Sequence, residues 1–182
     1  MAGLLAAACL AGCGTPTQSL TMGITAADAL QLRTWVPEGL KQNVLLDQVQ
    51  GGESTSKWWG SKVSGLTLEQ SLEDSLRSLG MLPMSPQAPA LYQLRVQLLS
   101  VVQPLVAADT TVTVTINYSL VDRASGAVLY QRALRTAHKT DFSDSMLSMP
   151  DRTRQANEGA VRENIIAMLR DLMALRIPEP TR

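Results

Sequence analysis

An α+β fold is predicted for this sequence, with two helices packed on one face of a four-stranded, mainly antiparallel sheet. Two segments carry apolar residues at helical spacing, and several others alternate apolar and polar residues as half-buried strands do. Their order along the chain is strand, helix, three strands, helix. Each helix has one apolar stripe and each strand one apolar face, so packing both helices on the same sheet face buries all of them together.

The first strand is expected within residues 41–50, where apolar residues lie between Gly39 and the Gly51-Gly52 pair. This strand joins the rest of the sheet through a helix, so its pairing can be parallel or antiparallel. Trp58 and Trp59 follow in a polar segment. We interpret one ring as a lid on the core and the other as a surface group, with contact to a ligand or to lipid headgroups as the alternative.

The first helix is predicted over residues 67–79, because leucines recur there every three or four residues. Thr67 and Gln70 have the spacing of a capping box, and Gly80 suits a left-handed C-terminal cap. Glu69 and the other charged residues of this helix are placed on its solvated side. The apolar stripe consists of Leu68, Leu72, Leu76 and Leu79.

Three strands are predicted after a proline-rich connection over residues 82–90. They lie within 91–101, 111–120 and 127–136, and the second has the most regular alternation of apolar and polar residues. The segment 122–126 between the last two strands is expected to be a hairpin loop, with Gly126 supplying a positive φ. The resulting sheet has one apolar face and one polar face.

The second helix is predicted over residues 152–175, and Pro178 and Pro180 follow its end. Its small residues Ala156, Gly159 and Ala160 favour a close approach to the sheet. Its charged residues, Glu158 and Arg162 among them, are placed off the apolar stripe. That stripe consists of Val161, Ile165, Met168, Leu172 and Leu175.

A lipid anchor is predicted at Cys13. The segment Leu10-Ala11-Gly12-Cys13 follows a short apolar run, as in the motif that a lipoprotein signal peptidase cuts before the acylated cysteine. That run is well short of the roughly 20 residues that a membrane-spanning helix needs. Cys9 and Cys13 are the only two cysteines, and both lie in the segment to be removed or modified, which argues against a disulfide or a metal pair.

Four regions are expected along the chain. Residues 1–12 are interpreted as a signal peptide that begins upstream of Met1, because no side chain before Cys13 is basic. Residues 13–34 are expected to be the lipidated cysteine and a flexible tether, because this segment is rich in Thr, Ser, Gly and other small residues. A single domain is expected over 35–177, followed by a loose tail over 178–182.

The residues that catalysis requires are not evident in the sequence. His138 is the only histidine, and neither a nucleophile elbow, a phosphate-binding loop nor a Cys/His/Asp cluster with metal-ligand spacing occurs. The formal net charge is +0, which gives no sign of nucleic-acid partners. We therefore expect a protein that is not an enzyme and has no cofactor and no metal site.

The lipidation motif, the helix over 67–79, the strand that begins at Tyr92, the hairpin of residues 120–129 and the final amphipathic helix resemble small Gram-negative envelope lipoproteins. The chain is similar to the auxiliary lipoproteins of ABC-type lipid transporters and, less closely, to the LPS-assembly lipoproteins. The resemblance implies a non-catalytic accessory that binds another envelope protein. Gly14, in place of Asp, is similar to the residue after the cysteine in lipoproteins sent to the outer membrane, with the domain facing the periplasm.

Two functional hypotheses follow from the patterning. The first is an adaptor to an envelope transport or assembly complex, in which the polar face of the sheet binds the partner. The residues expected on that face are Gln93, Arg95, Gln97, Thr111, Thr113 and Thr115. The alternative is a carrier that binds a lipid or glycolipid in a cavity between helices and sheet, bordered by the flexible Met81, Met84, Met146 and Met149.

Overall fold

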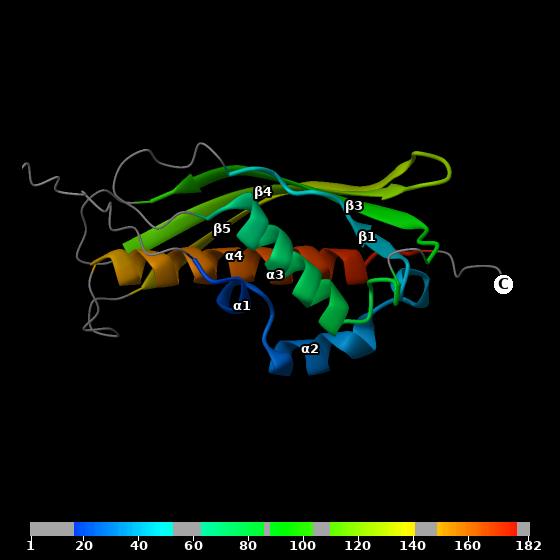
Figure 1. Ribbon diagram of the computed structural model, residues 1–182, viewed down its shortest axis with the longest axis horizontal. Helices are drawn as coiled ribbons and strands as arrows, with labels where there is room; N and C mark the ends of the chain where they lie inside the picture. Colours follow the sequence, from blue (N-terminus) through cyan, green and yellow to red (C-terminus); the bar gives the residue numbers. More distant parts are fainter. Residues whose placement is uncertain (1–16, 53–62, 86–87, 104–109, 141–148, 178–182) are drawn as a thin grey trace, which may run out of the picture.

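A mixed β-sheet forms the centre of the fold in the computed structural model of this protein, which describes residues 17–52, 63–85, 88–103, 110–140 and 149–177 (Figure 1). The strands lie in the order β1-β3-β4-β5, and β2 also pairs with β3. Strand β4 is antiparallel to both of its neighbours, β3 and β5, whereas β1 and β2 run parallel to β3. Their bounds are Val44–Leu46 (β1), Gln50–Gly51 (β2), Tyr92–Val102 (β3), Thr110–Asp122 (β4) and Val128–Thr140 (β5).

The first predicted strand is divided in two, which corrects the expectation of one strand over 41–50. Val44 pairs with Tyr92, and Gln50 pairs with Gln97. The segment from β1 to β2 therefore advances six residues while β3 advances five. The extra residue lies in the connection between β1 and β2, where buried Val49 interrupts the ladder. The structure also decides the orientation that the sequence leaves open, because both short strands are parallel to β3.

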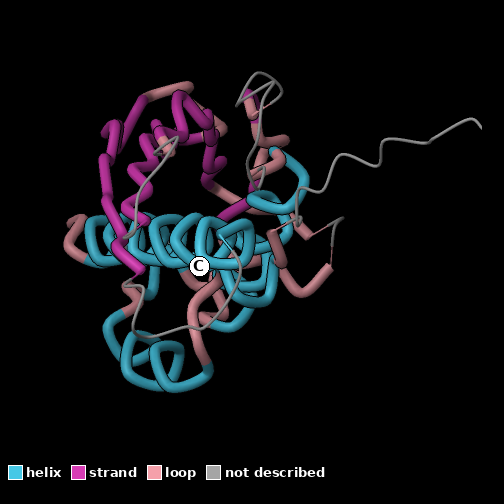
Figure 2. Tube along the Cα trace, turned by 90° about the vertical axis from the view of Figure 1, so that its left-hand side faces the viewer, coloured by secondary structure: helices cyan, strands magenta, loops and turns pink. Residues whose placement is uncertain are grey.

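Helices α3 (Gly65–Ser78) and α4 (Met149–Met173) lie on the same face of the sheet (Figures 1 and 2). Helix α4 contacts β4 and β5, and α3 contacts β1. The leucine stripe predicted for the first helix is buried, as are Val161, Ile165, Met168 and Leu172 of the second. These side chains form one core with the apolar residues of the sheet, which confirms the predicted α+β fold.

The start of α3 differs from the predicted capping box. Ser64 has extended backbone angles and is the N-cap, and its Oγ accepts a hydrogen bond from the Thr67 N–H at 3.0 Å. Thr67 is therefore the third residue of the helix and does not cap it, so the predicted start was wrong by two residues. The prediction for the other end is confirmed, because Gly80 follows the helix with a φ of 70°.

Residues 17–34 are folded, which corrects the predicted tether in the part that the structure describes. The segment forms α1 (Ser19–Met22), α2 (Ala26–Leu32) and the start of the 3-10 helix η1 (Arg33–Trp35), which η2 (Glu38–Leu40) follows. Met22 is fully buried, and α2 begins with a capping box between Thr25 and Asp28. The composition suggested disorder because small polar residues outnumber apolar ones. However, Met22 and Ala29 belong to the core, and Ile24 and Leu32 pack against it.

Hydrogen bonds join this N-terminal segment to the two main helices. The Gln18 N–H donates to Glu158 Oε1 of α4 at 3.0 Å, and the Ser71 hydroxyl of α3 donates to the Ser19 carbonyl at 3.0 Å. Arg162 of α4 donates to the carbonyls of Thr21 and Gly23. As a result, α1 and α2 form an additional layer on the side of α3 and α4 that faces away from the sheet (Figures 1 and 2).

The hairpin between β4 and β5 is predicted to show a specific pH dependence. Asp122 Oδ1 accepts hydrogen bonds from the N–H groups of Ala124 and Ser125 and from the Ser125 hydroxyl, and Gly126 has the predicted positive φ, 74°. The donors of Ser125 and Ala124 lower the pKa of Asp122 below its ordinary value. A lowered pKa means that this stabilisation is complete above the ordinary Asp pKa of about 3.9 and is lost as the pH falls through the folded-state pKa.

We expect an NMR titration of the Asp122 carboxyl to give a midpoint below that of an unstructured aspartate. The matched control is Asp74 of α3, an exposed carboxylate that pairs with the Arg77 side chain. A midpoint for Asp122 at or above the ordinary value would contradict the hydrogen-bonded turn.

Candidate functional site

The candidate site lies on the face of the sheet opposite α3 and α4, here called the outer face. Along β3 and β4 every second residue is buried toward the helices, so the residues between them point to the other side. No helix in the described part of the chain covers this side (Figure 2). The six residues predicted for the polar face all lie on it: Gln93, Arg95 and Gln97 on β3, and Thr111, Thr113 and Thr115 on β4.

The strand register separates these six residues into two groups. Gln97 pairs with Asn117, whereas Thr115 pairs with Ser100 and Thr113 with Val102, beyond an irregularity between Leu98 and Ser100. The β3 group therefore lies toward one end of the outer face and the threonines toward the other. The sequence showed that both groups share a face, but only the register shows that they are not direct neighbours.

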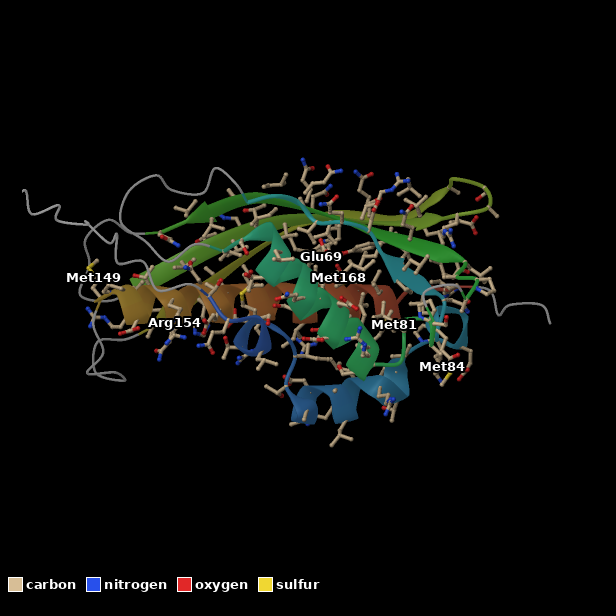
Figure 3. The ribbon with its side chains drawn as sticks, viewed as in Figure 1. Glu69, Met81, Met84, Met149, Arg154 and Met168 are labelled. Atoms are coloured by element: carbon tan, nitrogen blue, oxygen red, sulfur yellow. The ribbon has the colours of Figure 1, made fainter. Side chains whose placement is uncertain are left out.

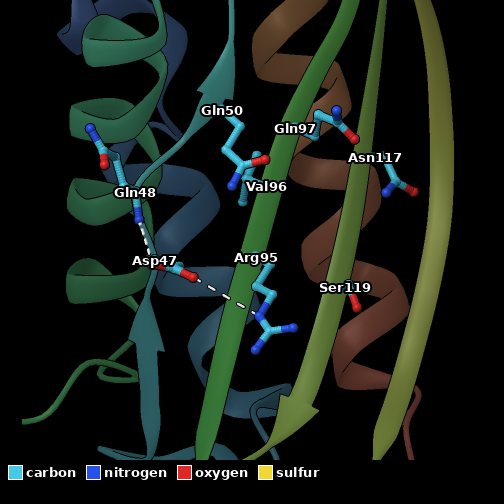
Figure 4. A pocket seen from close by; sticks show the side chains of 8 residues that line it. All are labelled: Asp47, Gln48, Gln50, Arg95, Val96, Gln97, Asn117 and Ser119. Atoms are coloured by element: carbon cyan, nitrogen blue, oxygen red, sulfur yellow. Dashed lines mark hydrogen bonds and ion pairs between the residues drawn. The ribbon is translucent and has the colours of Figure 1, made fainter.

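Arg95 and Gln97 of the β3 group border a hollow of about 390 Å³ between the β1–β2 connection and strands β3 and β4 (Figure 4). Seven of the eight described residues that line it are polar or charged, and Val96 is the exception. We call it the carboxamide hollow, because four of its side chains end in an amide group. Its lining residues are Asp47, Gln48, Gln50, Arg95, Val96, Gln97, Asn117 and Ser119.

Two contacts position the β1–β2 wall of the hollow. Glu69 Oε2 of α3 accepts a hydrogen bond from the Val49 N–H at 2.9 Å. This contact corrects the prediction that Glu69 lies on the solvated side of the helix. Gly51 has a φ of 88°, and a Cβ at this position would lie 2.3 Å from the Leu98 carbonyl oxygen. Only glycine fits such a backbone conformation at this distance, so Gly51 allows β2 to pair with β3.

The charged groups of the hollow form a loose pair. Arg95 Nε lies 3.9 Å from Asp47 Oδ2, and both side chains are substantially exposed. Such a pair contributes little to stability, so Arg95 and Asp47 can exchange it for contacts with another molecule. The amide groups of Gln48, Gln50, Gln97 and Asn117 offer both donors and acceptors. The hollow is therefore suited to a polar surface such as a peptide backbone, and not to an acyl chain.

The sequence analysis found only part of this site. It included Gln97 and Arg95 but missed Asp47, Gln48 and Gln50, because the segment that carries them was interpreted as one continuous strand. Asn117 and Ser119 have the same period-two alternation as the predicted threonines, and this alternation was the available signal for them. Cys13, Trp58 and Trp59 lie outside the described residues.

His138 lies on β5 and connects this strand to α4, away from the carboxamide hollow. Its Nδ1 is 2.7 Å from Glu163 Oε1. Among the described residues, no group of three or more His, Cys, Asp or Glu side chains is arranged to hold a metal ion. The pair thus has a structural explanation as a link between sheet and helix.

The methionines that suggested a lipid cavity do not surround a common space in the described part of the chain. Met81 is fully buried in the core, whereas Met84 is 88% exposed. Met149 lies at the opposite end of the molecule (Figure 3), and Met146 is outside the described residues. The packed residues of the core fill the space between α4 and the sheet, so these methionines give no support to the carrier hypothesis.

The comparison with solved structures identifies proteins of the same architecture. A candidate lipoprotein from Caulobacter crescentus CB15 matches with a TM-score of 0.52 and 17% identity over 79% of this chain and 93% of its own. A Xanthomonas campestris protein of family DUF330 matches with a TM-score of 0.55 and 13% identity over 74% of this chain and 86% of its own. A minor lipoprotein from Acinetobacter baumannii matches with a TM-score of 0.50 and 15% identity over 78% and 98% of the two chains.

The chain shares its fold with lipoproteins of Gram-negative bacteria. At these identities the similarity establishes the fold alone. No protein-family model matches the sequence, and the comparison with curated proteins gives no match. Within the described residues, no helix has the length and apolar composition needed to cross a membrane.

Proposed function

We propose that this protein is an outer-membrane lipoprotein that faces the periplasm and acts as a non-catalytic adaptor in an envelope transport or assembly complex. The observation that carries the proposal is the outer face, a polar surface with the carboxamide hollow at one end and no described helix over it. A polar hollow of this kind matches the docking of a protein segment through its backbone groups.

The proposed location rests on Cys13 and the residues that precede it. The Leu10-Ala11-Gly12-Cys13 motif supplies the acylation site, and the lipoproteins of the same fold support this assignment. Several acyl chains on one cysteine hold a protein on a membrane firmly, whereas a single chain does so only marginally. An anchored domain of this size would offer its outer face to a partner in the periplasm.

The chemistry of the hollow favours an adaptor over a lipid carrier. A site for an acyl chain is lined mainly by apolar side chains, but Val96 is the only apolar residue among those described around the hollow. The large apolar side chains on the helix side of the sheet are already packed against one another. Binding of a lipid between the layers would require this core to separate.

Site-specific photo-crosslinking in cells tests the adaptor role. A photoreactive residue at Gln97, in the hollow, is expected to give an adduct with one envelope protein. A probe at Gln70, exposed on α3, is the matched control and is expected to give none of that adduct. A probe at Thr113 reports whether the contact extends to the threonine end of the face. Recovery of uncrosslinked monomer alone from both Gln97 and Thr113 would overturn the adaptor proposal.

The anchor is tested separately. Mass spectrometry of the protein from its native host is expected to find acyl groups on Cys13, and a Cys13→Ala variant is expected to leave the membrane fraction. An unmodified Cys13 in membrane-bound protein would contradict the proposed anchor. It would not affect the adaptor proposal, which the crosslinking experiment tests.

A further inference from the structure

Three large apolar side chains are exposed on the N-terminal layer of the molecule, within 16 residues of sequence. Leu20 of α1 is 84% exposed, Leu30 of α2 is 74% exposed and Trp35 of η1 is 73% exposed. Single exposed leucines are common, but a tryptophan this exposed is unusual because its large ring is ordinarily buried in a core or an interface. No residue in the described part of the chain covers these three side chains.

These residues belong to the layer that lies farthest from the outer face. Helix α1 contacts α3 and α4, and α2 contacts α3, so both lie on the side of the main helices away from the sheet (Figures 1 and 2). The outer face and the three apolar side chains therefore belong to opposite layers of the molecule. A membrane that contacts the three apolar side chains therefore leaves the outer face accessible to a partner.

The proposed anchor is attached close to this layer. Cys13 precedes Thr17 by four residues, and an extended chain spans at most about 3.6 Å per residue, or about 14 Å here. Thr17 is buried, and the next residue is fixed to α4 through the hydrogen bond from the Gln18 N–H to Glu158. Arg162 holds the end of α1 in the same way. Acyl chains on Cys13 would consequently bring α1 to the surface of the bilayer.

We propose that Leu20, Leu30 and Trp35 form a membrane contact that inserts into the headgroup region of the bilayer and directs the outer face into the periplasm. The inference rests on the proposed lipid anchor, which supplies the bilayer. Leucine and tryptophan side chains are typical of such interfacial contacts. The charged residues in 17–40 are Asp28, Arg33 and Glu38, and Arg162 and Arg170 of α4 lie close enough to Asp28 to affect its charge. Burial of the three apolar side chains drives the contact.

Tryptophan fluorescence of the acylated full chain in phosphatidylethanolamine and phosphatidylglycerol vesicles tests the contact. Trp58→Phe and Trp59→Phe leave Trp35 as the only tryptophan. Lipids that carry a quencher near the headgroup are expected to quench Trp35 about threefold more than a control tryptophan, because interfacial tryptophans lie at the headgroup level. The control adds Trp35→Phe and Thr111→Trp, which moves the single tryptophan to an exposed position on the outer face.

Vesicle flotation in the same samples separates the two possible failures. Protein that carries no acyl group and does not float contradicts the proposed anchor. Protein that floats while its Trp35 is quenched by aqueous iodide as fully as the control tryptophan overturns the membrane contact and leaves the anchor intact. Shielding of Trp35 from iodide without vesicles, together with a doubled mass in sedimentation, would assign the surface to a second copy of the chain and also overturn the proposal.

Discussion

Replacing Asn164 with alanine is expected to lower the free energy of unfolding by about 3 kcal/mol, because it leaves buried polar groups without partners. Asn164 is fully buried in α4, and its Oδ1 accepts a hydrogen bond from the Tyr118 hydroxyl of β4 at 3.0 Å. Its Nδ2 donates to the Leu134 carbonyl at 2.9 Å and to Thr136 Oγ1 at 3.0 Å, both on β5. One side chain thus joins the longest helix to two strands.

Urea unfolding followed by circular dichroism measures this effect. Asn117→Ala is the matched control, because Asn117 precedes Tyr118 on β4 but points to the outer face, and we expect a change within about 0.5 kcal/mol. Burial raises the pKa of Tyr118, so its hydroxyl stays protonated and remains a donor. The double variant Asn164→Leu with Tyr118→Phe is expected to lose less free energy of unfolding than the sum of the two single variants, because each single change leaves the other partner of the hydrogen bond unpaired. Equal losses for Asn164→Ala and Asn117→Ala would contradict this account of the network.

Gly159→Ala is expected to destabilise the protein by about 1–2 kcal/mol, as overpacking of a close contact does. Alanine in place of glycine inside a helix ordinarily stabilises it by about 1 kcal/mol, so the expected sign is opposite to the helix propensity. A Cβ on Gly159 would lie 2.3 Å from His138 Cδ2 and 2.5 Å from His138 Cγ on β5. The ring is held in place by its contact with Glu163, so it does not move aside freely.

A second background isolates the cause. In a His138→Ala protein the ring is absent, and Gly159→Ala is expected to stabilise by about 1 kcal/mol, as helix propensity predicts. The measurement is again the urea midpoint, with all four proteins of the cycle compared. A stabilising Gly159→Ala change in both backgrounds would show that α4 and β5 are not in close contact at this position.

The sequence analysis correctly predicted the helices and strands in which the apolar residues are the buried ones. The stripe Val161, Ile165, Met168 and Leu172 is buried against the sheet, and the small residues near the start of α4 do allow the close approach at Gly159. Patterning failed where a polar side chain is buried, because periodicity assigns polar residues to solvent. Glu158 was placed off the stripe for this reason, yet it is buried and binds the N-terminal segment.

The candidate site was only half predictable because it depends on contacts between distant segments. Alternation within β3 and β4 placed Gln97 and Thr113 on one face without any knowledge of pairing. The parallel pairing of Gln50 with Gln97 brings together residues that are far apart in sequence, and no local pattern specifies it. The contact from Glu69 to the Val49 N–H likewise joins a helix to a connection outside it.

The hydrogen bond from the Gln18 N–H to Glu158 imposes an order on folding. The two residues are 140 positions apart, so a chain that emerges with its amino end first contains Gln18 long before Glu158 is present. Helix α1 can therefore dock on α4 only after almost the whole domain is available.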